Sequence, residues 1–294
     1  MNFSIKAKKV LSSVMALALL TAGASAADTS IVKNIIPTNT LTAEAVTPNA
    51  KTWGQWKYII KSSTTCYVAG YTGKDKVIFV PETINGYVVK GVAESAFAGE
   101  TGRTELKLPR GSTDIGDYAF AYSSFNRIVI PEGTTEIGDY ACYYATNLTD
   151  FNIPNVCRII NQHAFEGTKI SRFISPYVSR SELGWVGIGA FANTPLNTLT
   201  LNGRWSVCGQ AFANCTNLYN VEMNEDAFDS AIGNGAFQNC TNLTYVNGLC
   251  VWSTKAGQPY IVNEKHRVTI GRYSYRLLSD NIGFYNAYYR ALHS

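Results

Sequence analysis

Residues 115–131 read IGDYAFAYSSFNRIVIP, and residues 137–154 repeat the same order of side chains as IGDYACYYATNLTDFNIP. Each stretch opens with a six-residue motif that runs from a β-branched residue to a core residue, with alanine just before the core residue. The motif occurs seven times between Val92 and Gly248. Its core residues are Phe97, Phe120, Cys142, Phe165, Phe191, Phe212 and Phe237, which lie 23, 22, 23, 26, 21 and 25 residues apart. Such a period predicts a solenoid, in which short units stack and bury a shared core.

A second pattern follows each core residue after a few positions. Apolar side chains alternate there, for example at Phe125, Ile128 and Ile130, which is typical of a β-strand. Proline comes directly after five of these strands, as Pro81, Pro109, Pro131, Pro154 and Pro176. Because proline cannot donate to a ladder, it ends each strand at the same place. Each coil is therefore predicted to contain a short parallel strand, a turn, the motif corner and a return.

The combination of L-x-I-x-I-P strands, I-G-x-x-A-F corners and N-C-T-N-L turns resembles the BspA-like branch of bacterial leucine-rich repeat proteins. The resemblance covers roughly Thr52 to Gly248. It implies a right-handed solenoid, export to the cell surface or the medium, and binding of other macromolecules without catalysis or a cofactor. The sequence departs from the family pattern at Cys142, where phenylalanine is expected. It also departs between Phe165 and Phe191, where extra residues around Ser179 to Trp185 predict a bulged loop.

The chain divides into five predicted segments. Residues 1–26 carry lysines, an apolar run and an Ala-Ser-Ala site, which are typical of a secretory signal peptide. A permanent anchor is the alternative, but the run is about half of what spans a bilayer. Residues 27–51 are predicted to be a flexible linker, with a pro-segment as the alternative. Residues 52–91 should form an N-terminal cap and the first strand, 92–248 the solenoid, and 249–294 a degenerate repeat and C-terminal cap.

The charge of the predicted mature chain is close to zero. The whole chain has 25 Lys and Arg against 21 Asp and Glu, and residues 1–26 hold three lysines and no acidic residue. Removing the leader therefore leaves 22 against 21. No basic stripe remains, so we expect no binding to nucleic acid.

Both ends of the solenoid need a cap, because a terminal coil exposes its core face. At the N-terminal end, Trp53, Trp56 and Tyr58 with the strand 67–71 predict a covering hairpin, although the tryptophans could instead stack on sugar. At the C-terminal end, residues 260–262 and 267–270 flank a polar turn and predict a hairpin. Aromatic residues at helical spacing predict a capping helix over Asp280 to Ser294.

The seven cysteines of the chain give little support for chemistry. Cys215 and Cys240 share one column of adjacent coils, roughly 5 Å apart and within disulfide reach. An odd count and the lack of a C-x-x-C pair favour buried small hydrophobic residues, and no zinc site is expected. A hydrolase using Cys142 or Cys157 with His163 is the enzymatic alternative. It is disfavoured because Cys142 occupies the core column and His163 is expected to be a solvated side chain.

A binding surface is predicted from the strands, because every second side chain must point away from the core. The candidate partner-binding residues are Phe79, Lys107, Arg127, Val129, Asp150, Asn152, Arg172 and Ile174. Apolar side chains mixed with guanidinium groups suit a protein partner better than a polysaccharide groove, which would favour aromatic platforms. A solvated face with scattered apolar residues is the alternative.

We therefore expect a secreted or loosely surface-associated, monomeric and non-enzymatic binding module for an extracellular or host-surface protein. Two rival functions make different demands on the structure. A carbohydrate-binding protein should expose Trp185, Trp205 and Trp252 on one face. An enzyme should pair a cysteine with a histidine in a deep pocket.

Overall fold

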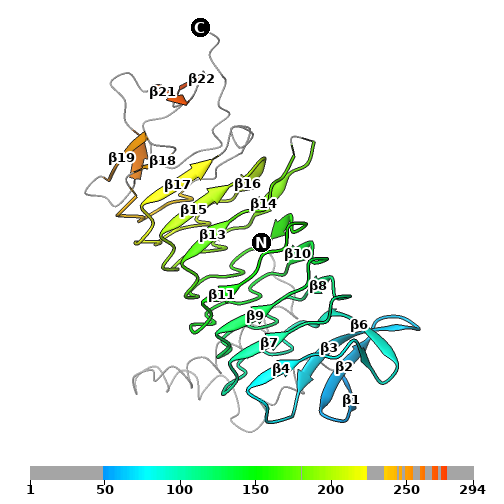
Figure 1. Cartoon of the computed structure of the whole chain (residues 1–294). Coiled ribbons are helices and arrows are strands. Elements are labelled where there is room, and N and C mark those ends of the chain that lie inside the picture. The colour runs from blue at the N-terminus through cyan, green and yellow to red at the C-terminus, as the bar shows by residue number, and fades with distance from the viewer. Residues whose placement is uncertain are drawn as a thin grey trace, which may run out of the picture.

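The computed structural model describes residues 49–179, 181–223 and 235–243, and the strand segments 245–246, 249–253, 259–261, 267–270 and 273–276. In the described part of the chain, the coils stack along one axis (Figure 1). The predicted signal peptide, the linker up to residue 48 and the helix expected over Asp280 to Ser294 lie outside the described residues.

Two ladders of mostly parallel strands run along the solenoid, because each coil contributes one strand to each ladder. The first, here the L-x-L ladder, contains β4 (Val77–Phe79), β7 (Glu105–Lys107), β9 (Arg127–Val129), β11 (Asp150–Phe151), β13 (Arg172–Ile174), β15 (Thr198–Leu201), β17 (Asn220–Met223) and β18 (Tyr245–Val246). The second, here the motif ladder, contains β6 (Tyr87–Val92), β8 (Asp114–Ile115), β10 (Glu136–Ile137), β12 (Ile159–Ile160), β14 (Gly184–Val186) and β16 (Trp205–Val207). The predicted solenoid of short parallel strands is confirmed.

The two ladders differ in continuity. The motif ladder pairs every strand from β6 to β16 with the next, whereas the L-x-L ladder splits into β4-β7-β9-β11 and a second sheet that begins at β13. Strand β13 pairs forward with β15 through Arg172 and Thr198, and β11 pairs back with β9. The L-x-L ladder is therefore interrupted between the coil of Cys142 and the coil of Phe165, so the outward side chains of its strands do not form one continuous column.

The N-terminal cap extends the motif ladder. Strands β1 (Lys51–Trp53), β2 (Trp56–Ile60) and β3 (Thr65–Tyr71) form an antiparallel meander, and β3 then pairs in parallel with β6, which also holds β5 (Thr83–Ile84). Tyr58 is buried, and the ring of Trp56 lies 4.5 Å from that of Tyr71. The expectation that Trp53 also covers the core is wrong, since its strand is exposed along its whole length.

The strands described after β18 depart from the solenoid pattern. Strand β19 (Leu249–Ser253) pairs antiparallel with β20 (Pro259–Ile261), and β21 (Arg267–Ile270) pairs antiparallel with β22 (Tyr273–Arg276). The predicted hairpin between residues 260–262 and 267–270 is therefore wrong, because each of these segments pairs with a different neighbour.

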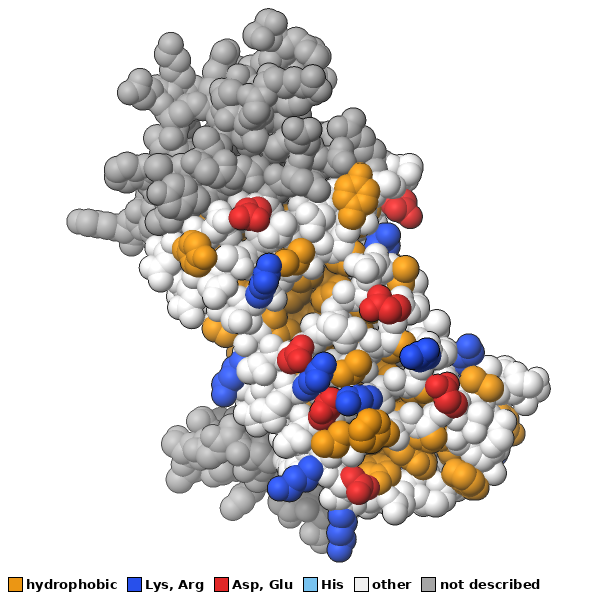
Figure 2. All heavy atoms as spheres, in the orientation of Figure 1, with side chains coloured by type: hydrophobic (Ala, Val, Ile, Leu, Met, Phe, Trp, Pro, Cys, Tyr) orange, Lys and Arg blue, Asp and Glu red, His pale blue; other side chains and the backbone are white. Residues whose placement is uncertain are grey.

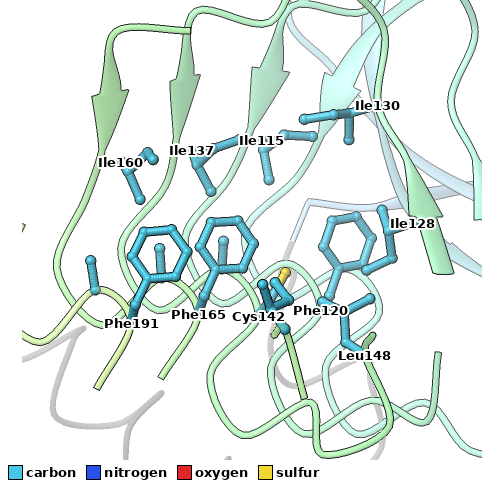
Figure 3. Close-up of a cluster of buried hydrophobic side chains, with 14 of the residues drawn as sticks. Ile115, Phe120, Ile128, Ile130, Ile137, Cys142, Leu148, Ile160, Phe165 and Phe191 are labelled. Atoms are coloured by element: carbon cyan, nitrogen blue, oxygen red, sulfur yellow. The ribbon is translucent and has the colours of Figure 1, made fainter. Parts of the chain in front are cut away.

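The core column lies along the solenoid axis, and all seven of its side chains are buried. The ring centroids of Phe165 and Phe191 lie 5.1 Å apart, and those of Phe191 and Phe212 lie 5.5 Å apart. Figure 3 shows the isoleucines of the motif ladder in a parallel row beside these rings, with Cys142 between Phe120 and Phe165. The sequence period thus becomes a column in space, because the same position of each coil recurs at the strand spacing of about 4.8 Å.

In each of the first four coils, whose core residues are Phe97, Phe120, Cys142 and Phe165, three backbone hydrogen bonds close the corner to the next coil. In the coil of Phe120, for example, the N–H groups of Tyr118, Phe120 and Tyr122 donate to carbonyl oxygens in the coil of Cys142, at 2.9, 2.7 and 2.7 Å. The residues two positions before and two positions after each core residue have positive φ. They are Ser95, Tyr118, Tyr140, His163, Gly189, Gln210 and Gly235 in one column and Gly99, Tyr122, Tyr144, Gly167, Asn193, Asn214 and Asn239 in the other.

We expect the substitution Phe165→Ala to lower the free energy of unfolding by about 3–5 kcal/mol, because it opens a cavity between two stacked coils. Ile174→Ala is the matched control, since Ile174 is 44% exposed and its truncation should change stability by about 0.5 kcal/mol or less. Urea unfolding of both variants measures this difference. Equal stability of the two would show that the core column is not where the coils are held together.

Candidate functional site

The outward face of the L-x-L ladder holds the candidate binding residues. Ile78, Leu106 and Ile128 point into the core, so their strand neighbours point out. Phe79 is the most exposed large hydrophobic side chain of the described residues, at 64%. The ammonium group of Lys107 lies 5.0 Å from the centre of the Phe79 ring, in a cation–π contact. An exposed aromatic ring beside a cation is therefore present at the N-terminal end of this face.

Charged side chains next to this ring form a chain of ion pairs. The Arg127 guanidinium lies 3.0 Å from Asp150 and 3.7 Å from Glu105, and Lys107 lies 3.2 Å from Glu105. Arg127 and Asp150 are about half exposed, so each contact contributes only about 0–1 kcal/mol. The ion pairs hold the side chains in one arrangement and leave this part of the face close to neutral.

Two candidate residues have structural roles instead. The side-chain amide of Asn152 accepts a hydrogen bond from the Ile130 N–H at 3.1 Å and donates one to the Ile130 carbonyl at 2.8 Å. The amide thus takes the place of a backbone unit of the next strand. Val129 is half-buried. Neither residue offers the free group that the sequence pattern suggested.

The break in the ladder divides the remaining candidates into two patches. The N-terminal patch consists of Phe79, Lys107, Arg127 and Asp150, and the C-terminal patch consists of Arg172 and Ile174 on β13. Arg127 and Val129 on β9 do not form one continuous patch with Arg172 and Ile174 on β13, because β11 and the break lie between these strands. Figure 2 shows side chains of both charges and hydrophobic side chains interspersed over the visible face.

The tryptophans do not form the platform that a carbohydrate-binding protein would need. Trp205 is fully buried, and its Nε1 donates to the carbonyls of Pro176 and Asn202 at 3.2 and 3.1 Å. Trp185 is 41% exposed, on the motif ladder. The side chain of Trp252 lies outside the described residues. The carbohydrate-binding alternative requires three exposed tryptophans on one face, and Trp205 does not meet this requirement because its ring fills the core.

The cysteines and histidine of the enzymatic alternative are also held in structural positions. Burial raises the pKa of the Cys142 thiol well above its usual range and that of Cys157 to about 11. His163 is not a solvated side chain: its ring stacks on Tyr140 with centroids 4.8 Å apart, and its Nδ1 lies 2.5 Å from Glu166 Oε2. Among the described residues, no His side chain contacts a cysteine through a hydrogen bond.

Cys215 and Cys240 are reduced in the structure. Their thiols donate to the carbonyl oxygens of Phe191 and Phe212 in the preceding coils, at 3.2 and 3.1 Å. Both therefore satisfy buried backbone acceptors between coils. No three His, Cys, Asp or Glu residues in the described part of the chain are grouped so that they could hold a metal ion. The described part also has no helix that is long and apolar enough to cross a membrane.

One feature of the surface was not predicted from the sequence. Tyr118, Tyr140 and His163 stack face to face at successive corners, with centroids 4.8 Å apart at both steps. Tyr122, Tyr143 and Tyr144 pack around them. The signal was available, because these residues recur at two positions before and one or two positions after the core residue. Their ring faces cover one another, so Tyr118 is buried in the cluster while Tyr144 is 37% exposed.

Comparison with known proteins identifies the family. The model of the BspA type leucine rich repeat region matches residues 82–184 and 178–251, with 6 copies. The chain belongs to this family. The BspA-type match includes the whole core column, the motif ladder from β6 to β16 and the L-x-L ladder except β4. No curated protein matches the chain.

Several solved structures resemble this BspA-type chain at low identity. A leucine-rich repeat protein from Bacteroides ovatus is 20% identical with a TM-score of 0.47, and the match covers 67% of this chain and 46% of that one. The leucine-rich repeat protein of T. pallidum is 19% identical with a TM-score of 0.45, covering 66% and 90%. The pneumococcal vaccine antigen PcpA is 14% identical with a TM-score of 0.40, covering 68% and 71%. This chain thus spans less than half of the Bacteroides ovatus protein.

We expect Gly189→Ala to be more destabilising than Gly235→Ala. Both glycines have φ near +60°, at 61° and 64°, so alanine should cost about 1–2 kcal/mol at either position. A Cβ at Gly189 would lie 2.5 Å from His163 Nδ1, whereas at Gly235 the nearest atom is 3.4 Å away. The excess cost should disappear when His163→Ala is introduced with Gly189→Ala, as urea unfolding of the single and double variants would show. An excess that persists would mean that the stacked ring is not the obstacle.

We expect the Cys157 thiol to be unreactive in the folded protein. A pKa of about 11 leaves on the order of one thousandth of the thiol ionised at pH 8, against about a quarter for an ordinary cysteine. Because burial raises the pKa, reactivity should increase only as the pH approaches 11 or when the chain unfolds. Iodoacetamide labelling followed by peptide mass spectrometry, with and without urea, measures this. Rapid labelling of folded Cys157 at pH 8 would revive the nucleophile hypothesis.

Proposed function

We propose that the chain is an exported, non-catalytic binding module that holds an extracellular protein partner on the N-terminal patch of its L-x-L ladder. A leucine-rich repeat solenoid is typically a binding scaffold. The observation that supports this surface is Phe79, which is 64% exposed on a regular strand next to Lys107. Interfaces concentrate their binding energy in such apolar anchors, ringed by polar groups that exclude water.

The arrangement around Phe79 supports a protein partner in two further ways. The ion-paired row of Glu105, Arg127 and Asp150 presents both signs of charge in fixed positions, which gives specificity more than affinity. Strands β4, β7 and β9 are rigidly paired, so little conformational entropy is lost on binding. Export is proposed from the leader-like residues 1–26, and N-terminal sequencing of protein recovered from the medium tests it, with a start at or near Ala27 expected.

The partner would be found by screening the full chain in parallel against extracellular matrix proteins, host-cell surfaces and polysaccharides. For the partner found, Phe79→Ala should weaken binding at least about tenfold, because a central aromatic anchor carries 1.4 kcal/mol or more. Surface plasmon resonance measures the dissociation constants, and thermal unfolding checks that the variant is folded.

The matched control is the double variant Arg172→Ala with Ile174→Ala, which removes the C-terminal patch beyond the ladder break. We expect it to change affinity less than threefold. Loss of binding in this variant with full binding by Phe79→Ala would move the site to the C-terminal patch. Retention of polysaccharide alone in the screen would reject a protein partner.

A further inference from the structure

A second surface lies on the other ladder. Successive strands of the motif ladder place one residue each in register on the outward side, a set here called the outer row. It consists of Asp114, Glu136, Ile159, Trp185 and Ser206 on β8, β10, β12, β14 and β16. The next residue of each strand is buried in the core, so the outer row faces away from it. The row changes from acidic to apolar across four adjacent strands.

The apolar end of the outer row is exposed although its strand is paired on both sides. Trp185 is 41% exposed, and Leu183 and Ile188 beside it in sequence are 48% and 46% exposed. The Trp185 N–H donates to the Arg158 carbonyl at 2.7 Å, which holds the strand in the ladder. Gly184 lies flat on the buried indole of Trp205, where a Cβ would approach to 2.5 Å. The core below is thus already filled, so the Trp185 ring cannot turn inward.

The acidic end carries four carboxylates on two adjacent coils: Asp114, Asp117, Glu136 and Asp139. Their hydrogen-bond donors are neutral groups: Asp117 accepts from the Asp139 N–H at 2.8 Å, Glu136 from Asn161 at 2.6 Å and Asp139 from Gln162 at 3.0 Å. No described lysine or arginine forms a salt bridge with any of the four. Burial raises the pKa of the Asp117 carboxyl, and the nearby charges of Asp139 and Glu136 raise it further.

The charges of Asp139 and Glu136 therefore act against that of Asp117 in the free protein, and a cation placed over these carboxylates would relieve the repulsion. Tyr118 and Tyr140 come directly after Asp117 and Asp139, so aromatic edges and hydroxyl groups border the carboxylates. On the apolar side, the exposed large side chains of Leu183, Trp185 and Ile188 lie within six residues of one another, and exposed apolar groups of this kind mark interaction sites. The acidic and apolar ends of the outer row together are complementary to a partner that is cationic at one end and apolar at the other.

We propose that the outer row binds a short extended peptide segment of a partner protein, with lysine or arginine side chains over β8 and β10 and a large apolar side chain against Trp185. The charge of the carboxylates selects a basic segment and excludes an acidic one. Three strand spacings of about 4.8 Å separate β8 from β14, roughly 14 Å, which an extended chain covers in about four residues. The segment therefore carries its basic and apolar side chains about four residues apart. This surface is separate from the L-x-L face and does not depend on the function proposed for it.

The test uses the full chain and a fluorescent peptide, Lys-Lys-Ser-Gly-Ser-Trp-Leu-Gly. Two control peptides carry glutamate in place of both lysines or serine in place of the Trp-Leu pair. Fluorescence anisotropy should show binding of the first peptide only, weakened about fivefold or more in 0.5 M salt because these surface charges are screened. The variant Glu136→Gln with Asp139→Asn and, separately, Trp185→Ser should each weaken binding about fivefold or more. Phe79→Ala on the other ladder should leave it unchanged.

Ile188→Ser provides a second apolar variant in case Trp185→Ser fails to fold, which far-ultraviolet circular dichroism would reveal. Three results would overturn the proposal: no peptide binds, the serine control binds as well as the first peptide, or Trp185→Ser and Ile188→Ser both bind like the wild type. The chain's own residues 249–294 are also basic, with six Lys and Arg against two Asp and Glu. Self-association of the full chain in sedimentation velocity, abolished by Glu136→Gln with Asp139→Asn, would assign the row to a second copy and likewise overturn a partner protein.

Discussion

Every coil of this protein must reverse its chain at the motif corner without leaving buried backbone groups unpaired, and the rest of the fold depends on how it does so. In the first four coils three N–H groups of each corner donate to the corner of the next coil, as those of Tyr118, Phe120 and Tyr122 do, and two do so at Phe191 and Asn193. Aiming alternate N–H groups along the axis requires positive φ on both sides of the core residue. The corner is thus a third ladder, which fixes the spacing at which the core rings and the two sheets stack.

Positive φ costs about 1–2 kcal/mol for most side chains, and the corners meet this cost in two ways. Later coils use glycine or asparagine after the core residue, and Asn193, Asn214 and Asn239 also link their amides at 2.9 Å from coil to coil. The coils of Phe120 and Cys142 use tyrosine on both sides of the core residue, and the rings of Tyr118 and Tyr140 stack on one another. The aromatic column therefore offsets backbone strain, which accounts for tyrosine in a conformation that it rarely adopts.

The sequence predicts those features that depend only on the spacing of the core residues and on the alternation of apolar side chains along the strands. The Phe97 to Phe237 column and the prolines after five of the L-x-L strands need no knowledge of how coils are placed in space. Glycine and asparagine two positions after the core residue also indicate positive φ. Because Tyr122 and Tyr144 occupy the same position of their repeats, the repeat pattern predicts positive φ for them too. The break after β11 and the amide of Asn152 that replaces a backbone unit could not be predicted, because both depend on the relative shift of neighbouring coils.

Since the core column and the corners supply the stability, outward residues of both ladders are free to differ, and they do differ in kind. The L-x-L face interleaves both signs of charge around Phe79, and it is interrupted after β11. The motif ladder is continuous, and its outer row passes from carboxylates at Asp114 and Glu136 to the indole of Trp185. A face with mixed charges can position a partner at one place, whereas a row with a charge gradient also fixes the direction in which an extended partner lies. A continuous ladder is required for the second property, because a break would shift one end of the row against the other.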